Sequence, residues 1–361
     1  MERILITGSL GYFGSMLTNY LSNKGYLCKG IDTGFFKDEL LYSSEEGEIV
    51  IKDVRDMTES DLKDIDVVIH LAGISNDPVG SLDAASVYDP TRTYTLAIAK
   101  ICKKLQIRLI FASSCSVYGV GGDDFLTENS KTNPQTYYSL NKIQIEEDLI
   151  SLSDKHFSPI ALRFATIFGL SPRVRFDVVI NMFVGMALSS GNIILNSDGK
   201  AWRPNLYILD ACEAVRCAID LNYGGQELLV LNVGADTNNM QVIEIAENVK
   251  QSISGCQIKF LNNNPELGDG LIADRKINKG NDTRTYKVSF EKIQQVMSNF
   301  KVRWNIESGV KDMVEELNKL SFDSTIFKHR GFYRLQHLED LYERKELSDD
   351  LRWVDKESIL A

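Results

Sequence analysis

The chain opens with a short apolar segment that is followed at once by regularly spaced glycines. Arg3–Ile6 has the composition of a buried strand, and Thr7–Gly14 then places glycines at positions 8, 11 and 14. Glycines at this spacing permit a tight turn and let the backbone approach a pyrophosphate, to which the next helix presents its N–H groups. A strand, a glycine loop and a helix in this order predict a parallel sheet that binds a dinucleotide.

The first 115 residues alternate apolar runs with segments of helical length, as expected of βαβ units in a doubly wound parallel sheet. Predicted strands are Arg3–Ile6, Tyr26–Ile31, Glu48–Ile51, Val67–His70, Arg108–Ala112 and Pro159–Arg163. Predicted helices are Tyr12–Asn23, Ala84–Leu105 and Tyr138–Leu152. We therefore expect residues 1–170 to form a Rossmann-type domain of the α/β class.

After residue 170 the alternation gives way to longer connections. Met240–Ser252 and Ile293–Asn299 have apolar residues at helical spacing, whereas the last forty residues are rich in charge and carry aromatic residues at 327, 332 and 333. We expect residues 171–320 to form mainly a smaller α/β substrate-binding lobe, with some segments returning to the first domain. Residues 321–361 are predicted to form a C-terminal helical arm that packs on the body.

Composition excludes several kinds of partner. The 361 residues include 40 Lys and Arg against 50 Asp and Glu, a net charge of −10 that argues against nucleic acid and anionic membranes as partners. No apolar run approaches the roughly 18 residues of a membrane span, so a cytoplasmic location is expected. Six cysteines without metal-ligand spacing and four histidines predict neither a metal site nor a disulfide framework.

Asp32 stands at the end of the second predicted strand, 18 residues beyond Gly14. A carboxylate at this position accepts hydrogen bonds from both ribose hydroxyls and repels a 2′-phosphate, so it favours NAD over NADP. Asp53 and Val54 follow the third strand, where they either read the adenine edge or form an ordinary solvated loop. The predicted cofactor-binding residues so far are Gly8, Gly11, Tyr12, Phe13, Gly14, Asp32, Asp53, Val54, Leu71, Ala72 and Gly73.

Tyr138 and Lys142 are four residues apart and therefore share one face of a helix. An ammonium group at this spacing stabilises a phenolate, which makes the tyrosine usable as an acid or base near neutral pH. Ser114 ends the preceding predicted strand. A tyrosine and a lysine at this spacing are a weak signal by themselves. The signal is stronger here because the pair follows the glycine loop, Asp32 and Ser114 in that order along the chain.

With these motifs the chain resembles the extended short-chain dehydrogenase/reductase family, and within it the NAD-dependent nucleotide-sugar epimerases and dehydratases. The resemblance extends over residues 1 to about 315 and rests on segments Thr7–Gly14, Ser113–Gly119, Pro134–Lys142 and residues Asp32, Asp53, His70–Gly73 and Leu162–Arg163. It implies that Tyr138 is the acid/base on a sugar hydroxyl and that Lys142 binds the nicotinamide ribose. It further implies that Ser114 binds the reacting oxygen, that Tyr138 and Lys142 contact the cofactor, and that the protein is a homodimer built on the Ala84–Leu105 and Tyr138 helices.

Several polar residues are candidates for the diphosphate of a nucleotide sugar. Guanidinium groups match phosphate oxygens in pairs, although a surface ion pair is the ordinary role of any single arginine. The resemblance implies such contacts for Asn181, Arg203 and Arg284. The full predicted substrate-binding set is Ser114, Thr166, Arg173, Arg175, Asn181, Arg203 and Arg284.

The favoured activity is 4-epimerisation of a nucleotide-diphosphate sugar through a transient 4-keto sugar. The related 4,6-dehydratases place an Asp-Glu pair after the serine or threonine, but this chain has Cys115 and Ser116, which disfavours dehydration. Thr91 and Thr166 stand where relatives often have asparagine. A nucleotide-sugar dehydrogenase or 4-ketoreductase stays open as the alternative, and a non-enzymatic NAD-binding module is the least favoured reading.

Overall fold

The structure is a computed structural model that describes residues 2–45, 47–75, 84–261 and 284–354. Its central element is a seven-stranded sheet in the order β11-β7-β5-β4-β1-β2-β3, and every neighbouring pair is parallel. The strands are β1 (Arg3–Thr7), β2 (Leu27–Asp32), β3 (Glu48–Ile51), β4 (Val67–His70), β5 (Arg108–Ser114), β7 (Ile160–Phe164) and β11 (Leu229–Val233). The strand order reverses between β1 and β4, and this confirms the predicted doubly wound, Rossmann-type sheet.

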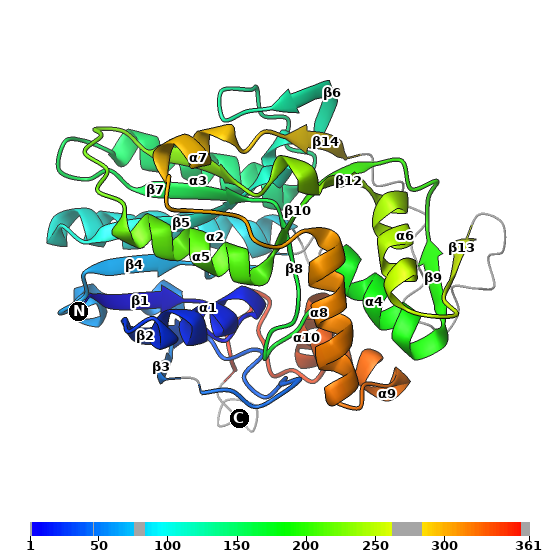
Figure 1. Ribbon diagram of the computed structural model, residues 1–361. Coiled ribbons are helices and arrows are strands. Elements are labelled where there is room, and N and C mark those ends of the chain that lie inside the picture. Colours follow the sequence, from blue (N-terminus) through cyan, green and yellow to red (C-terminus); the bar gives the residue numbers. More distant parts are fainter. Residues whose placement is uncertain (1, 46, 76–83, 262–283, 355–361) are drawn as a thin grey trace.

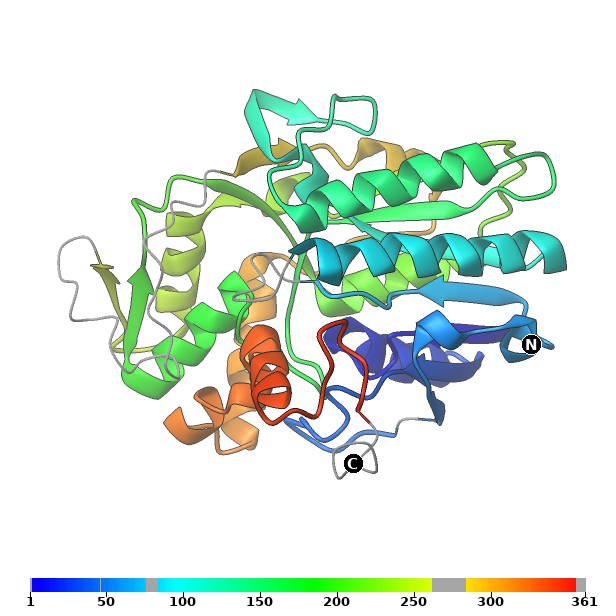
Figure 2. The ribbon, with the colours of Figure 1, turned by 180° about the vertical axis from the view of Figure 1, so that it is seen from behind.

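Helices cover both faces of this sheet. Figure 1 shows α1 (Tyr12–Asn23) and α5 (Ile208–Asp220) on one face, and Figure 2 shows α2 (Ala84–Leu105) and α3 (Tyr137–Leu152) side by side on the other. Leu17 and Leu21 of α1 are fully buried against the strand residues of one core cluster, while Ile145 and Leu149 of α3 belong to a cluster on the opposite face. Burial of the strands on both faces explains why they are almost continuously apolar.

A second group of elements forms the smaller lobe. It contains the helices α4 (Val179–Ser190), α6 (Val242–Ser252) and α8 (Ile306–Lys319), with the parallel strands β9 (Asn192–Leu195) and β13 (Gln257–Phe260) at its outer edge (Figure 1). A three-stranded sheet lies between the two parts and consists of β8 (Thr166–Phe168), β10 (Trp202–Tyr207) and β12 (Asn239–Gln241). The domain boundary near residue 170 stays a prediction. After it in the chain, β11 joins the large sheet and α5 packs on one face of that sheet, so both segments return to the first part of the fold.

Some predicted boundaries differ from the observed ones. The predicted helix Met240–Ser252 begins at Val242, because Asn239–Gln241 pair with β10 instead. The predicted helix Ile293–Asn299 is α7 (Glu291–Val296), which follows the parallel pair β6 (Val120–Leu126) and β14 (Thr285–Val288). Within the described part of the chain, no helix has the length and apolar character needed to cross a membrane.

The C-terminal segment packs on the body, as predicted. It contains α9 (Ser324–Phe327), a short 3₁₀ turn at Arg330–Phe332 and α10 (Arg334–Glu343). Phe327, Phe332 and Tyr333 are buried around Phe176 of the smaller lobe, which explains the aromatic patch. Beyond α10 the chain crosses back toward β2 and β3 (Figure 2).

Candidate active site

A cavity of about 560 Å³ opens at the carboxyl ends of the strands, where the order of the sheet reverses. Ligands of open α/β sheets bind at this position. Its walls include all predicted cofactor-binding residues: Gly8, Gly11, Tyr12, Phe13, Gly14, Asp32, Asp53, Val54, Leu71, Ala72, Gly73, Tyr138 and Lys142. They also include the predicted substrate-binding residues Ser114, Thr166, Arg175, Arg203 and Arg284.

The glycine loop is shaped by close approaches that exclude side chains. Gly8 has a φ of +75° and a Cβ placed on it would lie 2.9 Å from the backbone nitrogen of Ala72. A Cβ on Gly14 would lie 2.0 Å from the carbonyl oxygen of Gly8. Gly11 is the N-cap of α1, so the first N–H groups of that helix face the cavity without a side-chain cap. This cradle fits a pyrophosphate, as the sequence predicts.

Asp32 ends β2 beside this loop. Its carboxylate accepts hydrogen bonds from the backbone N–H groups of Leu10 (2.9 Å) and Gly34 (2.7 Å), and it is 8% exposed. Burial raises the pKa of the Asp32 carboxyl, while the two N–H donors act in the opposite direction. A carboxylate fixed in this way next to the glycine cradle fits the hydroxyls of a ribose.

The predicted acid/base group lies at the other end of the cavity. Thr136 caps α3 through a hydrogen bond to the N–H of Ser139, so Tyr138 and Lys142 stand on the first two turns of the helix. Ser114 ends β5, and its hydroxyl oxygen accepts a 3.1 Å hydrogen bond from the N–H of Ser116. The side chains of Ser114, Tyr138 and Lys142 thus line one cavity from two elements that are neighbours in the fold.

Lys142 is fixed at the base of this site. Its Nζ donates a 2.7 Å hydrogen bond to the carbonyl oxygen of Ala112 and lies 4.6 Å from the centre of the Phe111 ring. Burial lowers the pKa of Lys142 to about 8, and the nearby carboxylate of Glu146 partly opposes this shift. A cationic group with few alternative partners in a buried site is well suited to stabilise a phenolate or to bind a ribose hydroxyl.

A buried ion pair holds α3, the helix that carries Tyr138 and Lys142, against the sheet. Arg163 on β7 binds Glu146 on α3 at 2.6 Å, and both side chains are less than 10% exposed. Arg163 also donates a 3.0 Å hydrogen bond to the hydroxyl of Tyr118, and the Ser113 hydroxyl donates to Glu146. These contacts tie α3 to β5 and β7 and so fix the helix that carries Tyr138.

One part of the cavity lining carries several arginines. Arg175 follows β8, Arg203 lies on β10, and Arg284 directly precedes β14. Arg203 donates a hydrogen bond to the carbonyl oxygen of Arg284, which places the two residues next to each other. Arg175 pairs with Asp177 at 2.8 Å and donates to the hydroxyl of Ser75. Three segments that are distant in sequence thus each contribute one arginine to the cavity lining.

Arg173 and Asn181 do not lie on the cavity wall. Arg173 is 1% exposed and donates to the carbonyl oxygens of Phe36 (2.9 Å) and Lys37 (2.7 Å). Asn181 is fully buried and binds the backbone of Gly169 and Arg175. Both side chains hold loops in place, because each one binds backbone groups of neighbouring loops before any ligand is present.

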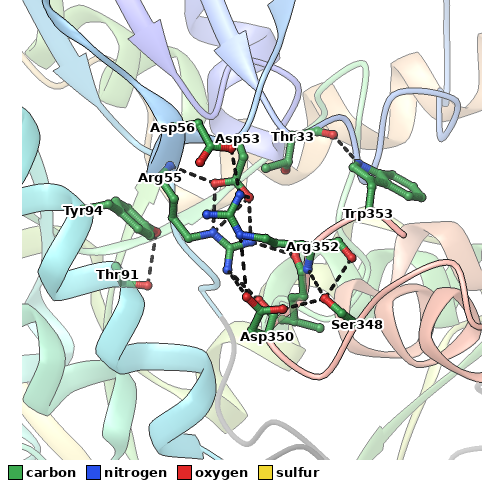
Figure 3. A network of polar contacts seen from close by, with 11 residues as sticks. Thr33, Asp53, Arg55, Asp56, Thr91, Tyr94, Ser348, Asp350, Arg352 and Trp353 are labelled. Carbon is green, nitrogen blue, oxygen red and sulfur yellow. Dashed lines mark hydrogen bonds and ion pairs between the residues drawn. The ribbon is translucent and has the colours of Figure 1, made fainter. Parts of the chain in front are cut away.

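Asp53 lines the cavity shortly after β3, but its carboxylate already has a strong partner. Its carboxylate binds the guanidinium of Arg55 at 2.6 Å and also accepts the N–H of that residue. The pair belongs to a larger network in which Tyr94 and Thr91 of α2 lie nearby (Figure 3). Arg55 was not predicted as a site residue, since an arginine two positions after an acid has no distinctive sequence signal.

Cys115 is a packing residue. It is 1% exposed, and its thiol contacts the carbonyl oxygen of Arg163 at 3.1 Å. Burial raises the pKa of the Cys115 thiol, so proton exchange with a ligand is disfavoured. Across the described residues, no cluster of three or more His, Cys, Asp and Glu side chains suited to a metal ion is found.

The sequence interpretation missed one entire wall of the cavity. Arg334, Leu338, Asp350 and Leu351, all from the C-terminal segment, line it together with Phe36 and Arg55. The only sequence signal was the unexplained length of charged and aromatic chain after residue 321.

Comparison with protein-family models gives a match over residues 4–234 to the family described as the NAD dependent epimerase/dehydratase family. Among curated proteins, UDP-N-acetyl-alpha-D-glucosaminuronate decarboxylase of Bacillus cytotoxicus is 29% identical over 69% of this chain and 80% of its own length. UDP-glucose 4-epimerase of Bacillus subtilis is 27% identical over 71% of this chain and 84% of its own length.

Solved structures share the fold. The UDP-glucuronic acid 4-epimerase of Bacillus cereus, in complex with UDP-glucuronic acid and NAD, aligns with a TM-score of 0.71 at 21% identity, over 88% of this chain and 99% of its own. An NAD-dependent NDP-hexosamine 5,6-dehydratase involved in tunicamycin biosynthesis aligns with a TM-score of 0.74 at 18% identity, over 88% of this chain and 98% of its own.

Proposed function

Because the chain belongs to the NAD-dependent epimerase/dehydratase family, it is an enzyme that modifies a nucleotide sugar with NAD, and we propose that its reaction is 4-epimerisation. The substrate is a nucleotide-diphosphate sugar and the intermediate is a 4-keto sugar. The observation that carries the proposal is that Tyr138, Ser114 and Lys142 line the same cavity as the glycine cradle and three arginines.

The set of proton-transfer groups favours epimerisation over dehydration. Removing water from a sugar requires a second acid/base in addition to the group that acts on the 4-hydroxyl. The position after Ser114 is occupied by Cys115, whose thiol is buried against the carbonyl oxygen of Arg163. Tyr138 alone is sufficient for an epimerase, because one proton leaves and returns at the same oxygen.

In the proposed reaction, ionised Tyr138 accepts the proton of the sugar 4-hydroxyl as the C4 hydrogen departs with its electron pair. NAD held on the glycine cradle and by Asp32 would supply the acceptor for that hydride and the donor for its return. Ser114 donates a hydrogen bond to the 4-oxygen, while the Lys142 ammonium stabilises the phenolate. After the keto sugar has turned, the hydride adds to the opposite face of C4 and Tyr138 returns its proton to the oxygen.

We assign the diphosphate to the basic wall formed by Arg175, Arg203 and Arg284, with Thr166 beside it. Guanidinium groups bind phosphate oxygens through paired hydrogen bonds, and these residues come from separate elements that converge on the cavity. The wall lies in a chain with a net charge of −10, so it is a local positive region that selects a small anion. Arg173 and Asn181 act behind this wall, as supports of its loops.

The alternative is a dehydrogenase or 4-ketoreductase, which uses the same residues. The 29% identical relative is named a decarboxylase. Oxidation of a uronic acid at C4 gives a β-keto acid, which loses carbon dioxide readily, so a decarboxylation can share the first step with epimerisation. What distinguishes epimerisation is that the redox state, the carbon count and the C4 hydrogen are all retained.

The test is incubation of the purified protein with UDP-glucose, UDP-N-acetylglucosamine and UDP-glucuronic acid in deuterium oxide. We expect the C4 epimer of one of these sugars, no net change in NADH absorbance and no deuterium at C4. Net NADH formation or consumption identifies an oxidoreductase, carbon dioxide release identifies a decarboxylase, and a 4-keto-6-deoxy product identifies a dehydratase. Each of these three results contradicts the proposal.

We also propose that the enzyme is a homodimer built on α2 and α3. These helices pack side by side over one face of the sheet (Figure 2), and Leu140 and Ile150 of α3 are 41% and 53% exposed. Two copies joined in this way form a four-helix contact, and light scattering measures the resulting mass.

All six cysteines are free, which fits the expected cytoplasmic, reducing compartment.

A further inference from the structure

The last described part of the chain, residues 334–354, crosses the mouth of the cavity at the adenosine end. We call this segment the C-terminal clasp. Leu338, Leu341, Leu347 and Leu351 are buried in one cluster with Tyr88 of α2, and partly buried Phe35, Phe36, Ile74 and Tyr138 pack on that cluster. The clasp is therefore attached by an apolar face to three separate walls of the cavity.

Polar contacts fix the clasp to the ends of β2 and β3. Arg55 donates hydrogen bonds to the carbonyl oxygens of Asp350 (2.7 Å) and Leu351 (3.1 Å). Arg352 binds the carboxylate of Asp56 at 2.8 Å. Trp353 donates from its indole nitrogen to the carbonyl oxygen of Thr33 at 2.6 Å (Figure 3). The residues joined to the clasp directly follow Asp32 and β3, where the adenosine half of a dinucleotide lies in this fold.

Leu351 has an unusual backbone. Its φ of 56° lies in the left-handed region, which is unfavourable for a residue with a side chain. The conformation is maintained because its N–H donates to Ser348 (2.8 Å) and its carbonyl oxygen accepts from Arg55. It places Leu351 on the cavity wall, where the residue is 5% exposed. Strain of this kind at a cavity wall points to a binding role.

Arg334 brings a positive charge from the clasp to the same cavity. Its guanidinium lies 4.2 Å from the centre of the Phe36 ring and donates to the carbonyl oxygen of Arg173 at 2.6 Å. Burial, together with the charges of Arg175 and Arg173, lowers the pKa of Arg334 to about 9, while Asp177 and Glu39 oppose the shift. An anion in the cavity relieves this repulsion, and the pyrophosphate of a dinucleotide on the glycine cradle is such an anion.

We propose that the C-terminal clasp is part of the NAD site: Leu351 and Asp350 cover the adenosine half, Arg334 faces the pyrophosphate, and NAD leaves only when the clasp detaches. The clasp thereby keeps one NAD molecule bound through successive turnovers. This inference rests on the family's use of NAD but is independent of the sugar carbon at which the enzyme acts.

The test compares NAD dissociation in variants that weaken clasp docking without touching the cavity. Arg352 and Trp353 do not line the cavity, so Arg352→Gln combined with Trp353→Phe leaves every residue of the cavity wall in place. The double variant removes the hydrogen bonds to Asp56 and Thr33, together with the longer ion pairs of Arg352 with Asp53 (3.8 Å) and Asp350 (3.6 Å). We expect NAD to dissociate at least about tenfold faster from this double variant, since the ion pairs of Arg352 and the hydrogen bond of Trp353 are lost. Arg344→Gln is the matched control, because this exposed clasp residue bonds only within the clasp among the contacts described. An unchanged dissociation rate in a folded double variant overturns the proposal.

Hydrogen exchange gives a second readout that needs no variant. NAD added to the apoprotein is expected to slow exchange throughout residues 334–354, whereas UDP-glucose alone leaves that exchange unchanged. Clasp protection by UDP-glucose but not by NAD contradicts the inference. Neither experiment requires turnover of a nucleotide sugar. The expected NAD dissociation and hydrogen exchange can therefore be observed even if the protein does not epimerise a sugar, and in that case the clasp inference stands while the proposed reaction fails.

Discussion

The Nζ of Lys142 lies 5.5 Å from the centre of the Tyr138 ring, one helical turn further along α3. The lysine is fixed at this distance because its ammonium also donates to the carbonyl oxygen of Ala112 on β5. Sheet and helix thus hold the two groups together before a ligand binds. A positive charge preorganised beside a phenol is a low-cost way to stabilise the phenolate.

Tyr138→Phe should abolish turnover and leave NAD binding intact. The substitution removes only the hydroxyl that exchanges the proton, and general acid/base groups contribute about 10²–10⁴-fold to the rate. Tyr137→Phe is the control, since Tyr137 is 59% exposed on the neighbouring position of the same helix. Turnover by Tyr138→Phe within tenfold of the unmodified enzyme refutes the assigned role.

Asp32→Asn should weaken NAD binding and narrow the preference for NAD over NADP. The substitution removes the charge that strengthens hydrogen bonds to ribose hydroxyls and repels a 2′-phosphate, a loss of about 10–100-fold in NAD affinity. Titration calorimetry of the apoprotein with each dinucleotide measures both effects. Asp38→Asn, an exposed acid six residues later, should change neither affinity.

The buried pair of Arg163 and Glu146 should dominate the stability of the site's framework. Arg163→Met leaves the Glu146 carboxylate buried without its main cation and should lower the free energy of unfolding by about 3–5 kcal/mol. The double variant with Glu146→Leu should recover much of this loss, because the carboxylate that had lost its main cation is removed as well. Urea unfolding measures both, and a double variant no more stable than Arg163→Met argues against the explanation.

The more exposed pair of Arg92 and Asp148, which also joins α2 to α3, provides the comparison for that experiment. The Arg92 side chain is 42% exposed, so its loss should cost less than about 1 kcal/mol.

His70 should make the protein less stable in acid. Burial and, secondarily, the charge of Lys142 lower the pKa of His70 to about 3, from 6.5 in an unfolded chain. Between these values the unfolded state binds one more proton, so stability is full above pH 6.5 and falls as the pH decreases, by about 1.4 kcal/mol per pH unit.

The measurement is urea unfolding of the unmodified protein and of His70→Gln across this pH range. As the pH decreases, the free energy of unfolding of His70→Gln should fall less steeply than that of the unmodified protein. His156→Asn is the control, because His156 is an exposed histidine. Equal slopes in the unmodified protein and His70→Gln rule out His70 as the source.

Local patterns were sufficient to predict the doubly wound parallel sheet and a set of residues that line one cavity at its edge. The glycine loop, Asp32 at a strand end and the four-residue spacing of Tyr138 and Lys142 each depend on neighbours within a few positions of the chain. Backbone geometry converts such spacing directly into a turn, a strand end or a helix face. The seven-stranded sheet and the cavity at its switch point follow from these elements.

Only the tertiary structure decided which polar residues share the cavity wall. Arg173 and Arg175 are two positions apart, yet Arg173 is buried against backbone carbonyls and Arg175 lines the cavity. Arg55 meets Leu351 across 296 positions, and no periodicity or motif connects them. A contact at that separation is selected by the packing of the whole molecule, because apolar burial around Leu338 and Leu347 returns the C-terminus to the strand ends. The sequence by itself therefore determined the glycine loop, the acidic strand end and the Tyr138–Lys142 pair, while tertiary packing determined which distant residues share the cavity with them.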